Sequence, residues 1–129
     1  MSAQAATVAS VARRGYLNGW TDDELVARQV VKLAEELGEL ASTVETDDPQ
    51  LAWIMAELQI AGKKARALFD VPGLFVGATV HSAAATYELT DCQVVIDVAA
   101  HALGIPDIGY AAQVKAEKDV GRGVRNGQA

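Results

Sequence analysis

The sequence predicts an all-α protein folded as an antiparallel bundle of four to five helices. Half of the 129 residues are apolar, only 5% are aromatic, and 24 are alanine. Alanine is the strongest helix former and lets helices pack closely, whereas sheets favour β-branched and aromatic residues. Apolar residues also recur every three or four positions in several segments, which is the spacing of one helix face. The length fits a single domain over residues 1–129.

The first half of the chain contains the clearest helix signals. A short helix is expected over Ala5–Arg14, inside an N-terminal segment over residues 1–20. Thr21 and Glu24 then match a capping box, in which each side chain bonds to the other residue's backbone amide. The long helix behind this box is predicted to stop near Thr46. Its apolar residues alternate at spacings of four and three: Val26, Val30, Leu33, Leu37, Leu40 and Val44.

Capping residues, prolines and glycines predict the remaining boundaries. Asp48 and Pro49 fit the cap and the first position of a helix, and Gly104 fits the end of one. The predicted elements are a third helix from Pro49 to a point before Pro72, a loop over Pro72–Val80, a fourth helix over Ser82–Leu103, a last helix from about Pro106 to Val120, and a flexible tail over 121–129.

Charge and hydropathy exclude several classes of partner. The formal net charge of -6 argues against binding to nucleic acid or to an anionic membrane. The longest stretch without a charged residue, Val71–Tyr87, is too short and too polar to cross a bilayer. Cys92 is the single cysteine and forms no internal disulfide, as is typical of a reducing compartment. We therefore expect a cytoplasmic protein with neither nucleic acid nor membrane partners.

Three glutamates occupy one region of the second helix. Glu36 and Glu39 are three residues apart and share a face that lies about 100° around the helix from the apolar stripe. Glu35 lies one turn before Glu39. The pattern has two interpretations, a solvated flank of an acidic helix or a set of metal ligands.

The fourth helix contains two more carboxylates in apolar surroundings. Glu88 and Asp91 lie three residues apart on a stripe that valines continue, and the neighbouring stripe, which includes Cys92, is almost wholly apolar. A helix this apolar is expected to be central, with Glu88 and Asp91 pointing inward. Buried carboxylates cost several kcal/mol unless they are paired or bound to a metal. They therefore predict either salt bridges to Lys or Arg, or a hard cation such as Mg²⁺.

Taken in order, these residues resemble the MazG-like, all-α nucleoside triphosphate pyrophosphohydrolases. The resemblance covers most of the chain, over Thr21–Val44 and Ser82–Arg122. The additional helical segment between the two carboxylate motifs is longer than the compact members of the family need. The motifs that carry the resemblance are Glu35-Glu36-x-x-Glu39, Glu88-x-x-Asp91 and Lys115-x-x-x-Asp119-x-x-Arg122-Gly123.

The resemblance implies hydrolysis of a nucleoside triphosphate to the monophosphate and pyrophosphate. It implies a Mg²⁺ ion, replaceable by Mn²⁺, held by Glu36, Glu39, Glu88 and Asp91. It also implies three catalytic residues and three phosphate-binding residues. The catalytic residues are Glu35, Glu36 and Glu39, and the phosphate-binding residues are Lys32, Lys115 and Arg122.

Two of these roles have alternatives. Glu35 either helps to hold a second ion or orients and deprotonates the attacking water. Lys32 either binds phosphate or merely neutralises Glu36. The family resemblance further implies a homodimer or homotetramer. Two other functions fit the sequence, a phosphoribosyl-ATP pyrophosphohydrolase and a non-catalytic helical oligomer that binds a nucleotide or a metal.

Overall fold

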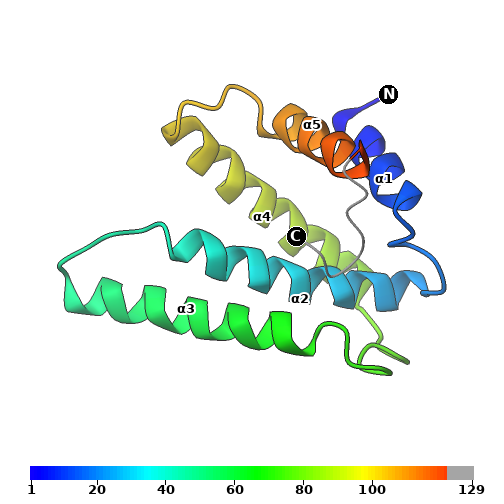
Figure 1. Cartoon of the computed structure of the whole chain (residues 1–129), viewed down its shortest axis with the longest axis horizontal. Helices are drawn as coiled ribbons and strands as arrows, with labels where there is room; N and C mark the ends of the chain where they lie inside the picture. The colour runs from blue at the N-terminus through cyan, green and yellow to red at the C-terminus, as the bar shows by residue number, and fades with distance from the viewer. Residues whose placement is uncertain (122–129) are drawn as a thin grey trace. The chain divides into compact units, whose positions relative to one another are not determined.

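The computed structural model describes residues 1–121, which form five α-helices and no strand (Figure 1). The predicted all-α class is therefore confirmed. None of the described helices is both long enough and apolar enough to cross a membrane. The helices are α1 (Ala3–Arg13), α2 (Asp22–Ala41), α3 (Pro49–Leu68), α4 (Ser82–Ala102) and α5 (Ile108–Gly121).

The chain groups into two compact units. One contains Met1–Gly19 and the described residues from His81 onward, and the other contains Trp20–Val80. The second unit is thus the α2–α3 hairpin with the loop that follows it, and the first contains α1, α4 and α5. The prediction of a single domain stays a prediction.

The starts of α2 and α3 follow the predicted capping chemistry. The Thr21 hydroxyl accepts the Glu24 amide at 3.1 Å, and the Glu24 carboxylate accepts the Thr21 amide at 3.0 Å. Asp48 accepts two backbone amides in the first turn of α3, which has Pro49 at its first position. These starts are set by side chains within three residues of the helix end, so the sequence alone identifies them.

The end of α2 differs from the prediction. The helix stops at Ala41 and not near Thr46. The hydroxyls of Ser42 and Thr43 donate to backbone carbonyls three residues earlier, and such local bonds compete with continued helix. All other helix boundaries lie within three residues of their predicted positions.

α2 and α3 run side by side in opposite directions (Figure 1). Their backbones meet at Gly38 and Gly62. A Cβ atom on Gly38 would lie 2.9 Å from the Gly62 Cα and 3.0 Å from the Leu58 carbonyl oxygen. A side chain at either position would therefore push the helices apart, so this crossing requires glycine on both helices.

The hairpin does not bury the apolar stripe of α2. The side of α2 that packs against α3 contains Arg28, Glu35, Gly38 and Ala41, all of which are buried. At 100° per residue the apolar stripe lies on roughly the opposite side of the helix. Every member of the stripe is exposed, namely Val26, Val30, Leu33, Leu37, Leu40 and Val44.

An aromatic cluster around Arg28 closes the hairpin at the start of α2. Arg28 is 3% exposed, and its guanidinium carbon lies 4.1 Å from the ring centre of Trp20 and 4.4 Å from that of Phe69. Phe75 packs edge-on against both rings. The planar guanidinium stacks on aromatic rings and keeps its charge when buried. Trp20 is thus a packing residue.

The loop after α3 is tied to the first turn of α2. Glu24 accepts the Gly77 amide at 2.8 Å, and Asp23 accepts the Val80 amide at 3.1 Å. Glu24 therefore serves both the helix cap and the loop. These bonds lower the pKa of Glu24 below its ordinary value, chiefly through the backbone amide of Thr21 and then that of Gly77.

In the other unit, α1 and α4 both contact α5. Ala100 and Ala116 are buried, as is Ser10, which accepts a hydrogen bond from Arg13 at 3.1 Å. Gly104 has a φ of +79° and terminates α4, as predicted from the sequence. The buried residues of this unit thus include small side chains from α1, α4 and α5, together with Tyr16 and Asp119.

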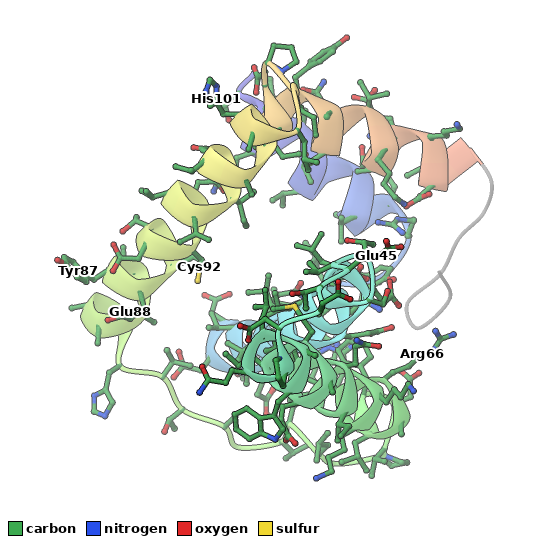
Figure 2. The ribbon with its side chains drawn as sticks, turned by 90° about the vertical axis from the view of Figure 1, so that its left-hand side faces the viewer. Glu45, Arg66, Tyr87, Glu88, Cys92 and His101 are labelled. Atoms are coloured by element: carbon green, nitrogen blue, oxygen red, sulfur yellow. The ribbon has the colours of Figure 1, made fainter. Side chains whose placement is uncertain are left out.

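The prediction that α4 is a central helix stays a prediction. Within its unit α4 contacts one helix, α5, and Ala100 is its one buried residue. Glu88, Asp91 and Cys92 are all exposed. Tyr87, which is 68% exposed, stands out from the first part of the helix (Figure 2). The other large exposed apolar side chains of α4 are Leu89, Val94, Val95, Ile96 and Val98.

Candidate functional site

Three of the predicted site residues come together on α2. Carboxylate oxygens of Glu35, Glu36 and Glu39 lie within 4.8 Å of one another. Mg²⁺ binds oxygen at about 2.0–2.1 Å, so two oxygens on one ion are at most about 4.2 Å apart. Glu36 and Glu39 are exposed and are free to make the remaining small adjustment. The donor set therefore fits a hard divalent cation.

Glu35 is the buried member of this cluster. It is 5% exposed, and its Oε2 atom lies 2.9 Å from Nζ of Lys32. The same Nζ lies 5.3 Å from the ring centre of Phe69, which further restrains the lysine. Lys32 therefore chiefly neutralises Glu35, one turn along the helix, and its predicted role in phosphate binding stays a prediction.

The surroundings of Glu36 disfavour its charged form. Its pKa lies above the ordinary glutamate value, first because the carboxyl is partly desolvated and second because Glu39 is negatively charged. Lys32 opposes this shift, and Glu35 adds to it. A bound cation would lower the pKa of Glu36 and so favour its ionised form.

A groove runs along the hairpin beside the glutamates. It has a volume of about 190 Å³, and the two contacting glycines form its floor. Arg66 Nη1 lies 3.9 Å from Glu39 Oε1, and Figure 2 marks Arg66 on α3. The side chains along the groove are Glu35, Glu39 and Ser42 from α2, and Gln59, Lys63 and Arg66 from α3.

The α3 residues of this groove were not identified from the sequence. The signal was present, because a glycine inside a helical pattern often marks a close helix contact. Gly38 and Gly62 are such glycines. Lys63 and Arg66 follow Gly62 by one and four positions, so they lie beside the contact.

Glu88 and Asp91 belong to the other unit. The polar residues of α4, Thr86, Thr90, Gln93 and Asp97, share one side of the helix, where Gln93 donates to Asp97 at 2.9 Å. At 100° per residue, Glu88 and Asp91 lie near the middle of the opposite, apolar arc, which is roughly 220° wide. Their surroundings on α4 are therefore apolar, as expected from the sequence. That they complete the glutamate site of α2 stays a prediction.

Of the two basic residues predicted near the C-terminal end, the structure describes Lys115. Lys115 Nζ lies 3.1 Å from Asp119 Oδ2, and Asp119 is largely buried while Lys115 is exposed. Lys115 is thus held in an ion pair along α5, and its role in phosphate binding stays a prediction. Arg122 lies outside the described residues.

The chain was compared with models of known protein families, with curated proteins and with solved structures, and none matched. The resemblance to MazG-like enzymes therefore rests on the motif residues themselves.

Proposed function

We propose that this chain is a Mg²⁺-dependent pyrophosphohydrolase that converts a nucleoside or deoxynucleoside triphosphate into the monophosphate and pyrophosphate. The observation that carries the proposal is the convergence of Glu35, Glu36 and Glu39 within 4.8 Å. Carboxylate oxygens at this separation suit a hard divalent cation. The order of the motifs, which resembles that of MazG-like enzymes, supplies the substrate class. A nucleotide substrate makes the cytoplasm the proposed location.

The proposed metal ligands come from two helices. Glu36 and Glu39 are the ligands on α2, and Glu88 and Asp91 are the ligands on α4. The apolar arc around Glu88 and Asp91 supports this assignment, because any element that covers the arc buries both carboxylates, and buried carboxylates need a cation. When bound, Mg²⁺ or Mn²⁺ neutralises phosphate charge and favours attack at phosphorus.

Glu35 is the proposed base. Its burial and its ion pair with Lys32 fix its orientation, which is what positioning a water molecule requires. In the proposed step the water oxygen bonds to the α-phosphorus, and Glu35 accepts the proton. The bond between the α-phosphorus and the bridging oxygen breaks, and pyrophosphate leaves with the electron pair.

A homodimer or homotetramer is the proposed assembly. One partner helix covers an apolar stripe of about 100°, whereas the apolar arc of α4 is roughly 220° wide. Covering α4 therefore needs more than one neighbouring helix in addition to α5. A second copy of this chain supplies such helices, including the apolar face of its own α2.

Product analysis tests the proposed reaction. The purified protein is incubated with each canonical ribo- and deoxyribonucleoside triphosphate, and with modified ones, in Mg²⁺ and in EDTA. Equal amounts of monophosphate and pyrophosphate are expected with Mg²⁺ only. Release of diphosphate and orthophosphate would refute the bond assignment. Stabilisation by Mg²⁺ without any turnover would instead favour a non-catalytic binding protein.

Variants test the assigned residues in the same assay. Replacing Glu36, Glu39, Glu88 or Asp91 with its amide should lower turnover by about a hundredfold, because charge on the phosphates loses its counterpart. Glu57→Gln on α3 and Asp97→Asn on the polar side of α4 are matched controls. Both positions are exposed and lie outside the proposed site, so these variants should keep full activity.

A further inference from the structure

The groove of the hairpin has two walls with the same spacing. On α2 the lining positions are 35, 38, 39 and 42, and on α3 they are 59, 62, 63 and 66. Each set follows i, i+3, i+4, i+7, which is one continuous helix face. Seven residues at 1.5 Å each make the groove roughly 10 Å long. Its position is set by the contact between Gly38 and Gly62.

The two walls carry opposite charges. The α2 wall has the carboxylates of Glu35 and Glu39, and the α3 wall has Lys63 and Arg66. Arg66 reaches across to Glu39 at 3.9 Å, which is longer than a direct hydrogen bond. Within residues 1–121, Lys63 forms no ion pair with a carboxylate. The α3 wall thus presents positive charge that Glu39 only partly compensates.

We propose that Lys63 and Arg66 bind the pyrophosphate end of a metal-bound nucleoside triphosphate, an assignment that rests on the proposed function. In this groove the glutamates repel a free anion, and Lys63 and Arg66 repel a free cation. A phosphate chain that carries a divalent cation matches both walls, since its metal meets the carboxylates and its outer oxygens meet the basic side chains.

The size of the groove supports the phosphate chain as its occupant. Pockets that enclose a whole organic ligand have volumes of about 300–1,000 Å³, and this groove has about 190 Å³. It therefore accepts part of a nucleotide and leaves the base and sugar outside. Lys63 and Arg66 also lie where they favour the proposed reaction, because negative charge accumulates on the departing pyrophosphate.

Binding of inorganic pyrophosphate tests this assignment without turnover. Titration calorimetry is performed with wild type, Lys63→Ala, Arg66→Ala and Lys64→Ala, each with Mg²⁺ and with EDTA. Lys64 is an exposed neighbour of Lys63 that does not line the groove, so Lys64→Ala is the matched control. Circular dichroism confirms that each variant remains helical.

Wild type and Lys64→Ala should bind pyrophosphate with Mg²⁺ and only weakly in EDTA. Lys63→Ala and Arg66→Ala should each weaken binding about tenfold, the effect of one lost charge-assisted hydrogen bond. Unchanged binding in both variants would overturn the assignment even if the enzyme is active. Pyrophosphate binding that depends on Lys63 and Arg66, in a protein that hydrolyses no triphosphate, would instead refute the proposed function and leave this site standing.

Discussion

Lys32 and Glu35 form a largely buried ion pair that links the candidate site to the hairpin core. Glu35 is 5% exposed, and the pair separation is 2.9 Å. Removing one partner leaves a buried charge without compensation, whereas removing both can be nearly neutral. Removing one partner should therefore lower the free energy of unfolding by more than removing both partners does.

A double-mutant cycle should reveal this asymmetry. Lys32→Met should lower the free energy of unfolding by about 2 kcal/mol, since the buried Glu35 carboxylate then loses its hydrogen-bond partner. Lys32→Met combined with Glu35→Gln should recover more than half of the loss. Urea unfolding at pH 7 measures wild type, Lys32→Met, Glu35→Gln and the double variant. Equal destabilisation by the single and the double variant would contradict the prediction.

Glu36 should make the metal-free protein less stable as the pH rises. Its pKa is raised above the ordinary value by partial desolvation and by the charge of Glu39, so its stabilising contribution is present at acid pH and lost as the carboxyl ionises through its raised pKa. Glu36→Gln should stabilise the protein by about 0.2–0.5 kcal/mol at neutral pH, the value of one like-charge pair on a helix.

Urea unfolding in EDTA at pH 4 and pH 7 measures this effect as the difference between wild type and Glu36→Gln. The variant should gain relative stability at pH 7, and Mg²⁺ should reduce that gain because it stabilises only the wild-type cluster. A variant less stable than wild type at pH 7 would show that Glu36 is not under electrostatic strain.

At the scale of the elements, the α2–α3 crossing should tolerate no side chain. A Cβ at Gly38 would lie 2.9 Å from the Gly62 backbone, so the helices must separate to accept Gly38→Ala. Overpacking costs about 1–3 kcal/mol and outweighs the helix-propensity gain of about 1 kcal/mol, so we expect a net loss of up to about 2 kcal/mol. Gly121→Ala, with open space around its Cβ, is the control and should be neutral or stabilising in thermal unfolding. A neutral Gly38→Ala would contradict the predicted close contact.

The hydrogen bond between Glu24 and the Gly77 amide in the loop after α3 should weaken in acid. The pKa of Glu24 is lowered by the amides of Thr21 and Gly77, so this hydrogen bond is fully formed above the ordinary value of 4.5 and weakens as the pH falls through the lowered pKa. The amide resonance of Gly77 should therefore titrate with a midpoint below 4.5. Glu24→Gln should abolish this titration. A midpoint at or above the ordinary value would contradict the prediction.

The elements also show what a sequence can specify. Helix starts were predicted correctly at Thr21 and Asp48 because a cap involves residues two or three positions apart. The end of α2 was missed because the hydroxyls of Ser42 and Thr43 compete for helix carbonyls, and periodicity does not register that competition. The groove residues of α3 were missed because they depend on which faces of two helices meet, and a pair of glycines decides this.

At the scale of the whole molecule, hydrophobic patterning identified apolar faces but not their partners. The apolar stripe of α2 was read correctly, yet the hairpin packs through the opposite side. The apolar character of α4 was also read correctly, but the helix is exposed along nearly all its length. The glutamates of α2 share one helix and could be grouped from spacing alone, whereas joining them to Glu88 and Asp91 depends on tertiary packing, which spacing does not specify.

Self-association should depend on the apolar arc of α4. Val95, which is 68% exposed, lies on the same stripe as Glu88 and Asp91. A lysine there is tolerated by the single chain, but in a proposed apolar interface it costs free energy even when it pairs with Asp91, because both charges lose their water.

Wild type should therefore have at least twice the chain mass of 13.6 kDa in light scattering at micromolar concentration, and Val95→Lys should shift it toward the mass of one chain. Thr90→Lys adds the same charge on the polar side of α4 and should leave the mass unchanged. A wild-type protein with the mass of one chain would refute the proposed assembly, and equal dissociation by both variants would show that added charge, and not the apolar arc, controls association.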